Sequence, residues 1–355
     1  MTDRMLLTGD PSSTPQKHGT FAAGDKVLQP DGAPLFESMP TVGTHEMHVD
    51  KFRTDSYTED GSPYRPYKTI AAALTYIRSV AVALQDWSLI IRTGQYTENV
   101  VLEDLGLLDS ISLVGHGGIV GIVPAAGNSL QSTANNGNLK KLRLINIETT
   151  KPIVITGPNG GTGFSDVWLQ DCKLNDAITL NCINSFSLMG CYLPVAISCT
   201  NVAWFYCDSA NWGGTFSFKC DSTADAPSGG FDCTALLNGV YQTGAVTLTK
   251  VGTANGVVAV LGGSRINSSS GTIVVPSGWT LQAYNSFIRG NLTNNGTFQQ
   301  RGAFVEKVFA NAGTWTADTK SSMLAYTPSV AGNWTVQPAT VQEALDMIAA
   351  KVGPV

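Results

Sequence analysis

The feature that most constrains the fold is a short pattern of alternating apolar residues that recurs along the middle of the chain. Its four clearest copies end near Asn, Cys or Asp and read LRLINI (142–147), VWLQDC (167–172), FSLMGC (186–191) and AWFYCD (203–208). Leu144, Leu169, Leu188 and Phe205 mark equivalent places in these copies. Self-similarity at a period of about 20–25 residues predicts a solenoid, in which each repeat buries its apolar side only against its neighbours.

Later in the chain, SRIN (264–267) and SFIR (286–289) repeat at a similar spacing. The repeats are separated by loops of variable length, and no L-x-x-L-x-L consensus is present, which favours a β-solenoid over a leucine-rich horseshoe. The Gly, Asn, Thr and Ser content excludes a coiled coil. These features predict an all-β fold of roughly seven to nine coils, about 40 Å long at the usual strand spacing.

One helix is expected before the repeats begin. Pro66 suits the first turn of a helix, where a missing N–H costs nothing, so a helix is predicted at about 66–84. Its apolar stripe consists of Ile70, Ala73, Leu74, Ile77, Ala81 and Leu84. After Trp87 the periodicity changes, because 89–91 and 99–102 are short runs of β-forming residues.

The order of these motifs resembles the N-terminal cap of the pectin-lyase-like superfamily, over about residues 48–118. The matching pieces are GSPYRPYKTIAAAL (61–74), WSLIIRTGQYTENVVL (87–102) and ISLVG (111–115). The resemblance implies a right-handed, single-stranded parallel β-helix with an N-terminal capping α-helix. The expected organisation is an arm or attachment segment at 1–45, the β-helix at 46–305, and a C-terminal segment at 306–355.

Composition narrows the class of protein. The chain has 37 Gly, 14% charged residues and a net charge of −5, which argues against a disordered chain and gives no reason to expect nucleic-acid binding. No apolar run approaches the ~18–20 residues of a membrane helix. The N-terminal run MTDRMLLTGDPSSTPQKHGT (1–20) lacks the apolar core of a signal peptide, so we expect synthesis in a cytoplasm and no membrane insertion.

The seven cysteines are expected to be structural. Their odd number and the absence of a CxxC pair argue against a disulfide framework and a zinc site. Cys172 and Cys191 occupy matching places in successive repeats, and Cys182 and Cys199 suggest a second series. We therefore predict stacked, reduced, buried thiols that act as small hydrophobic side chains.

Catalytic carboxylates are sparse in the repeat region. Enzymes of the resembled superfamily mostly use clustered carboxylates, as acid, base, nucleophile or calcium ligand. No Asp or Glu occurs at 177–207 or 234–305, and the esterase elements D-F-I-F-G and L-G-R-P-W are absent. The G.Y.E element at 94–98 matches those esterases, but there it shapes a turn. The sequence therefore predicts no catalytic residues, no metal ligands and no cofactor.

The four histidines do not complete a site either. His45 and His48 in HEMH lack the i, i+4 spacing of HExxH. His116 lies in a glycine-rich turn and is expected to be an exposed loop residue. The carboxylates that remain for an enzyme include Asp171 and Asp208, which a glycosidase mechanism would need within about 5–10 Å of each other.

The C-terminus is expected to form a short amphipathic helix at about 339–351, starting near Pro338 and ending at Gly353. The run QPATVQEALDMIA (337–349) resembles a segment common near the ends of phage fibres and other virion proteins. Two roles remain open for this helix, namely assembly of several chains and capping of its own solenoid. The candidate oligomerisation residues are Val341, Ala344, Leu345 and Ile348.

Together these features resemble a bacteriophage tail spike, short tail fibre or capsid decoration fibre, which implies a non-catalytic homotrimer located in the virion. Its expected partners are itself, other virion proteins through the N-terminal arm, and a host-surface glycan. Candidate carbohydrate-contact residues are Trp168, Trp204, Tyr206 and Trp212. The alternative is a carbohydrate-active β-helix enzyme that cleaves or de-esterifies polysaccharides; a bacterial adhesin is disfavoured by the missing signal peptide.

Overall fold

The computed structural model describes residues 45–81, 85–103, 105, 108–132, 141–157, 166–223 and 232–317. The chain divides between Gly43 and Thr44 into two units, and all of these residues belong to the second. The N-terminal arm and the helix expected at 339–351 lie outside the described residues. In the part that is described, no helix is long and apolar enough to cross a membrane.

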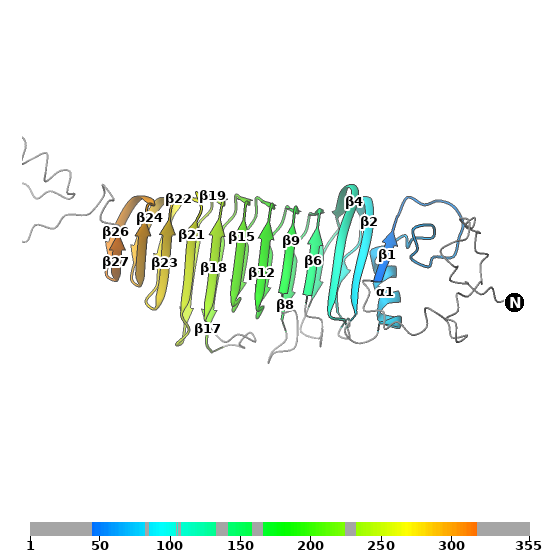
Figure 1. Ribbon diagram of the computed structural model, residues 1–355, viewed down its shortest axis with the longest axis horizontal. Helices are drawn as coiled ribbons and strands as arrows, with labels where there is room; N and C mark the ends of the chain where they lie inside the picture. Colours follow the sequence, from blue (N-terminus) through cyan, green and yellow to red (C-terminus); the bar gives the residue numbers. More distant parts are fainter. Residues whose placement is uncertain are drawn as a thin grey trace, which may run out of the picture. The chain divides into compact units, whose positions relative to one another are not determined.

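The second unit is a parallel β-helix, as the sequence predicted. Within the described residues, 27 strands join in one sheet, and strands of successive coils pair in parallel (Figure 1). The first face consists of β1 (His45–Val49), β2 (Asp86–Tyr96), β4 (Ser110–Ile122), β6 (Lys141–Ile145), β9 (Asp166–Gln170), β12 (Ser185–Met189), β15 (Trp204–Asp208), β18 (Cys233–Asn238), β21 (Gly256–Leu261), β23 (Trp279–Tyr284), β25 (Thr297–Arg301) and β27 (Thr314–Ala317).

Two further faces complete each coil. The second face holds the short strands β7 (Ile147–Thr149), β10 (Lys173–Leu174), β13 (Tyr192–Leu193), β16 (Asn211–Trp212) and β19 (Tyr241–Gln242). The third face holds β3 (Val100–Val101), β5 (Leu130–Ser132), β8 (Ile153–Thr156), β11 (Ile178–Asn181), β14 (Ile197–Thr200), β17 (Phe216–Asp221) and β20 (Val246–Val251). Towards the C-terminal end, β22 (Arg265–Val275), β24 (Phe287–Asn294) and β26 (Phe304–Asn311) each run across both faces, with a shift in register.

The described solenoid is longer than the sequence suggested. Twelve strands stack on the first face, and eleven rises at the usual strand spacing give about 50 Å, so the expectation of seven to nine coils was too small. Its last coils contain few residues: Thr280 is aligned with Thr297, and Thr297 is aligned with Thr314. Strands β26 and β27 also continue past residue 305, where the sequence placed the end of the β-helix.

The register explains the sequence repeats. Leu144, Leu169 and Leu188 are aligned in successive coils, as the spacing indicated. The next residue in that row is Cys207, whereas Phe205 is aligned with Phe186, so pairing Leu188 with Phe205 was wrong. The reason is that apolar alternation alone does not distinguish two positions on the same side of a strand.

A turn of left-handed backbone follows the first face in eight successive coils. The residues with φ of 48–62° at this corner are Asn146, Asp171, Gly190, Ser209, Gly239, Gly262, Asn285 and Gly302. Asn, Asp and Gly tolerate this conformation best. The Asn146 N–H donates to the Gln170 carbonyl at 2.9 Å, and the Asp171 N–H donates to the Met189 carbonyl at 2.9 Å. The Asn, Asp and Gly near the end of each repeat are therefore turn residues.

All seven cysteines are buried and none is in a disulfide, as predicted. The Cys191 residue stacks on Cys172, since the Tyr192 N–H donates to the Cys172 carbonyl at 2.9 Å. The predicted second series is wrong, because Cys199 is aligned with Leu180, whereas Cys182 lies in the turn after β11, with a φ of 54°. Burial raises the pKa of the Cys199 and Cys207 thiols, which keeps them protonated.

The helix α1 (Ile70–Val80) packs against β1, β2 and β3 at the N-terminal end of the solenoid (Figure 1). Its buried residues are Ile70, Ala73, Leu74 and Ile77, as the apolar stripe predicted. The helix starts later than expected, because the Thr69 side chain accepts a hydrogen bond from the Ala72 N–H at 3.1 Å and is the N-cap. Pro66 lies in the extended segment before this cap, where its carbonyl accepts a hydrogen bond from the Tyr57 hydroxyl at 2.9 Å.

Candidate functional site

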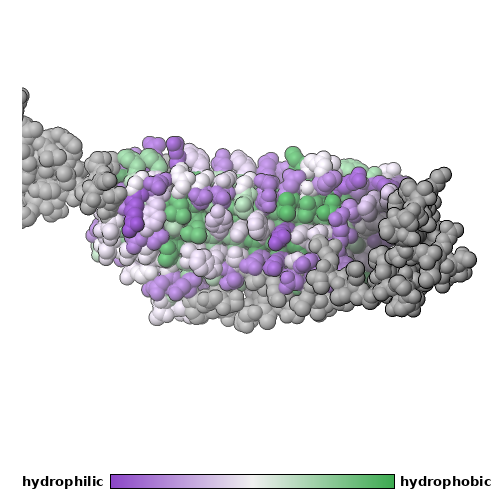
Figure 2. Space-filling view, in the orientation of Figure 1, coloured by the Kyte–Doolittle hydropathy of each residue, from purple (hydrophilic) through white to green (hydrophobic). Residues whose placement is uncertain are grey.

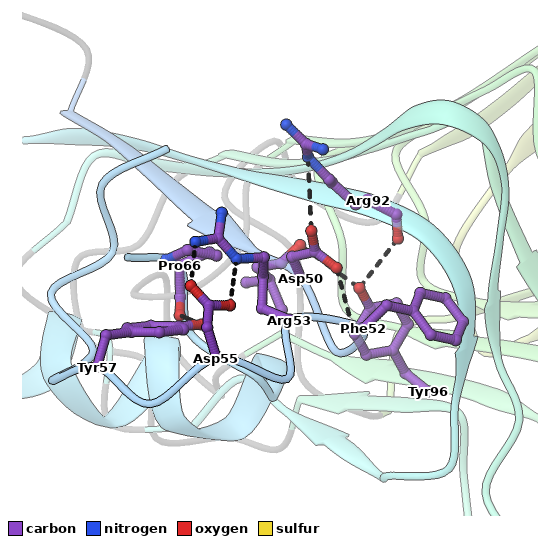
Figure 3. Close-up of polar contacts among 9 residues, drawn as sticks. Asp50, Phe52, Arg53, Asp55, Tyr57, Pro66, Arg92 and Tyr96 are labelled. Carbon is purple, nitrogen blue, oxygen red and sulfur yellow. Dashed lines mark hydrogen bonds and ion pairs between the residues drawn. The ribbon is translucent and has the colours of Figure 1, made fainter. Parts of the chain in front are cut away.

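The segment between β1 and α1 carries charged residues whose contacts lie within the fold (Figure 3). Arg53 donates to both carboxylate oxygens of Asp55, at 2.8 and 2.6 Å, and these bonds lower the pKa of Asp55. The Tyr57 ring lies 5.5 Å from the Arg53 guanidinium and 5.2 Å from the Lys68 ammonium. This cluster holds the segment in place, and its carboxylate is already engaged.

The neighbouring polar contacts in Figure 3 connect this segment to β2. Asp50 is buried and accepts a hydrogen bond from the Phe52 N–H at 3.0 Å, with the Arg92 Nε 3.8 Å from its other oxygen. The Tyr96 hydroxyl donates to the Arg92 carbonyl at 2.9 Å, and burial raises the pKa of Tyr96 to about 12. These groups close the N-terminal end of the solenoid.

The glutamate of the G.Y.E element has a structural position. Glu98 accepts hydrogen bonds from the Ile70 and Ala71 N–H groups, both at 2.8 Å. These are the first free N–H groups of α1, where a carboxylate is favoured by both hydrogen bonding and the helix dipole. Glu98 therefore caps the helix that closes the solenoid.

The two carboxylates that a glycosidase mechanism would need are separated along the solenoid. Asp208 is aligned with Met189 and Gln170, so Asp171 and Asp208 differ by two coil rises, about 10 Å. The Asp208 carboxylate accepts hydrogen bonds from Tyr206, Ser209 and Asn238, at 3.0–3.2 Å. Asp171 accepts one from the Gln170 side chain at 3.2 Å. Asp171 is a turn residue of the corner that follows the first face, and Asp208 is the last residue of β15, directly before the turn residue Ser209.

The outer side of the first face contains a pocket with a volume of about 240 Å³. We call it the Trp168 pocket. It is lined by Lys141, Leu142, Arg143, Asp166, Val167, Trp168, Ser185 and Ser187. Strand register places its outward residues in two rows, Lys141–Asp166–Ser185 and Arg143–Trp168–Ser187. The small serines leave space beside the large Trp168 ring, and this difference in size creates the hollow.

Charge and aromatic surface meet in this pocket. The Arg143 guanidinium lies 5.7 Å from the Trp168 ring centroid, within the range of a cation–π contact. The Lys141 ammonium is 3.6 Å from Asp109. Asp166 and Arg143 make no ion pair within the described residues. The pocket therefore offers one carboxylate, one guanidinium, two hydroxyls and an aromatic ring to a ligand.

Two further aromatic residues lie one coil beyond the serines. Trp204 is aligned with Ser185, and Tyr206 is aligned with Ser187. Trp204 is 54% exposed and Trp168 is 38% exposed, while Tyr206 is half-buried. Figure 2 shows that hydrophobic side chains gather in the middle of this face and that hydrophilic ones border them. The three predicted sugar-contact residues thus share one face, on either side of a serine-lined hollow.

The fourth predicted contact residue, Trp212, is in the core. Its side chain is fully buried and its indole N–H donates to the Val195 carbonyl at 3.0 Å. The ring packs against Phe205 and Phe216, with centroids 6.2 and 4.9 Å away. In β16 the exposed residue Asn211 precedes Trp212, and the alternation of side chains along a strand therefore directs Trp212 inwards. The prediction of Trp212 as a sugar-contact residue was wrong.

The histidines form no metal site within the described residues, where no three His, Cys, Asp or Glu side chains gather. His45 stacks on Trp87 at 4.7 Å, and the His48 Nε2 is 2.8 Å from a Glu46 oxygen. His116 is exposed, although it lies within β4. The candidate oligomerisation residues Val341, Ala344, Leu345 and Ile348 lie outside the described residues.

Sequence reasoning did not predict that the polar residues of the Trp168 pocket lie together. Arg143, Asp166 and the two serines come from three coils, and only the coil register brings them together. The sequence feature that could have indicated these residues is the alternation of side chains along a strand, since each of the four lies two residues from another outward residue on its strand.

Comparisons with protein families, with curated proteins and with solved structures find no match. The fold and the site define the class: a parallel β-helix protein with an aromatic and polar pocket on one face.

Proposed function

We propose that the protein is a non-catalytic structural component of a bacteriophage particle that binds a host-surface saccharide. It acts as a homotrimeric tail spike or short tail fibre, or as a capsid decoration fibre. The observation that carries the binding role is the Trp168 pocket, flanked by Trp204 and Tyr206 on one rigid face. The phage context is supported by the sequence resemblance of residues 337–349 to segments near the ends of phage fibres.

The chemistry of this face suits a saccharide. A sugar ring has apolar C–H faces that pack on aromatic rings and an edge of hydroxyl groups that need hydrogen-bond partners. Trp168 and Trp204 offer the rings, while Ser185, Ser187 and Arg143 offer donors and acceptors around the hollow. Because all of these side chains stand on strands of one sheet, little order is lost when a ligand binds.

Binding to arrayed bacterial surface polysaccharides, both capsular fragments and lipopolysaccharide O-chains, tests the proposal. We expect the full chain to retain at least one of these polysaccharides, and Trp168→Ala or Trp204→Ala to weaken that binding about tenfold, since one aromatic contact is worth about 1–1.5 kcal/mol. The matched control is Tyr64→Ala, which removes an 82% exposed ring from the segment before α1. Unchanged binding by both tryptophan variants, or no binding to any polysaccharide, refutes the saccharide role.

One observation keeps an enzyme as the second candidate. Asp166 lines the pocket with no ion-pair partner among the described residues, and Asp109 contacts Lys141 at its edge. Two carboxylates on either side of a bound sugar are what a glycosidase requires. Release of reducing ends from a retained polysaccharide, abolished by Asp166→Asn, would establish cleavage; retention without release supports the binding role.

A further inference from the structure

The second face of the solenoid is bounded by short corners on both sides. Two residues connect β12 to β13 at one corner, and three connect β13 to β14 at the other. The longer connections, from β5 to β6, β8 to β9 and β17 to β18, all join the third face to the first. No long connection therefore borders β10, β13, β16 or β19, and another surface can approach this face closely.

A row of aromatic side chains runs along this face. Register aligns one residue per coil in the order Tyr192, Asn211, Tyr241, Arg265, Phe287 and Phe304. Tyr192, Tyr241 and Phe304 are 47%, 44% and 40% exposed. Phe287 and Phe304 stack with centroids 4.9 Å apart and rings 11° from parallel. Because large exposed rings recur at every second coil or more often, they form a continuous apolar ridge, whereas single scattered residues would not form one.

Small residues flank this ridge. The exposed turn glycines on one side are Gly190, Gly239 and Gly302, and Gly213, Gly214 and Gly244 lie at the opposite corner. Glycines at a surface permit close backbone approach. The nearby charges are largely paired within the chain, Lys173 with Glu148 at 2.8 Å and Arg289 with Glu306 at 3.1 Å. The face therefore combines an apolar ridge with little net charge and with a strip of glycines along each side. We call these two strips, which stand lower than the ridge, the glycine shoulders.

We propose that this second face is the seam between copies of the chain, which lie side by side with their axes parallel. This inference rests on the proposed homotrimer and names the surface that forms it. The ridge repeats at the coil rise of about 4.8 Å, and a second copy has the same repeat, so both surfaces match at every coil. The ridge of one chain fits the glycine shoulder of the next, which is a heterologous contact that closes into a ring of three.

Two further features of the seam follow from this arrangement. Arg265 lies between Tyr241 and Phe287 in the row, and the aromatic ridge of a neighbouring chain offers its guanidinium a ring face. The ridge from Tyr192 to Phe304 spans five rises, about 24 Å, so each chain contributes few rings to the seam. Because the seam is small, we expect its central aromatic residues to dominate its stability.

The test is the solution mass of the full chain, measured by sedimentation over a range of concentrations. The first variant, Tyr241→Ser with Phe304→Ser, removes two rings of the ridge. The second, Gly213→Arg, adds bulk to the shoulder; a Cβ there has its nearest contact at 3.4 Å, from Pro194, so the fold accepts it. The controls are Tyr64→Ser, at a more exposed ring off the face, and Thr179→Arg, at an exposed site on the third face.

We expect a trimer for the wild type and for both controls. For both seam variants we expect a dissociation constant at least tenfold higher, with an unchanged circular dichroism spectrum. Wild-type trimers that both seam variants retain would overturn the seam and leave the proposed homotrimer intact. A wild-type chain that stays monomeric at every concentration would overturn both, whereas the saccharide-binding assay remains an independent test of the pocket.

Discussion

Replacing Glu98 tests whether the G.Y.E element is structural. Its carboxylate accepts hydrogen bonds from the Ile70 and Ala71 N–H groups at 2.8 Å, at the positive end of α1. In Glu98→Ala these two donors lose their protein partner, and water replaces it only in part because Glu98 is partly buried.

The magnitude follows from those two bonds. Losing an N-terminal cap costs about 1 kcal/mol, and the interaction of the charge with the helix dipole adds about 0.5–1 kcal/mol. We therefore expect Glu98→Ala to lower the free energy of unfolding by about 2 kcal/mol. Glu98→Gln keeps one acceptor and loses the charge, so about 1 kcal/mol is expected. Thr69→Ala, which removes the bond to the Ala72 N–H, should also cost about 1 kcal/mol.

Urea denaturation followed by circular dichroism measures these differences, and hydrogen exchange locates them. Exchange should accelerate at the first turn of α1 in Glu98→Ala, while the amides of β12 and β15 keep their protection. A change below about 0.5 kcal/mol with unaltered exchange in α1 would refute the capping role. Equal losses for the Ala and Gln variants would show that charge, rather than hydrogen bonding, carries the effect.

Four other expectations follow from the described contacts. Trp212→Ala should destabilise the fold by about 3–5 kcal/mol in urea, and an unchanged midpoint would contradict its place in the core. Gly214→Ala should cost about 2–4 kcal/mol, because its Cβ would lie 1.7 Å from the Val195 carbonyl oxygen; Gly213→Ala should stay within about 0.5 kcal/mol, and equal midpoints would refute this distinction. Hydrogen bonds from Lys219 and Thr223 lower the pKa of Asp221 to about 2. A carboxylate with a lowered pKa stabilises the fold at pH values above its unfolded pKa near 4, so this contribution should disappear as the pH falls towards 2. The stability of Asp221→Asn should therefore decrease less in acid than that of the wild type. An aromatic disulfide reagent should modify none of the seven cysteines before unfolding, because all are buried, and rapid labelling of the native protein would contradict this.

Much of the fold could be predicted from the sequence, because buried positions recur periodically along helices and strands and are occupied by apolar residues. The stripe from Ile70 to Ile77 predicted α1, and the alignment of Leu144, Leu169 and Leu188 predicted three coils. The error at Phe205 arose because inward positions two residues apart look alike in an alternating strand. Pro66 misplaced the helix start, since the Thr69 side chain defines the first turn.

The candidate site was less readable. Alternation gives the side of a strand on which a residue lies, but the register between coils decides which residues become neighbours. Trp168, Trp204 and Tyr206 were recognisable as aromatic residues of the repeats, whereas their grouping with Arg143, Asp166 and the serines required the register.

The sequence alone determined that the described part of this chain is a β-solenoid with a helix at its N-terminal end, because each coil carries its own apolar alternation and its own turn residue. Tertiary structure decided which outward side chains share a face and which cap a helix. The physical reason is that neighbours across coils are distant in sequence, with spacings set by loops of unequal length. Thr297 and Thr314 are neighbours across a short coil, and Ser110 and Lys141 are neighbours across a much longer one. Glu98 illustrates the difference: its motif is local, but the N–H groups that it caps belong to a helix that begins well before it, at Ile70.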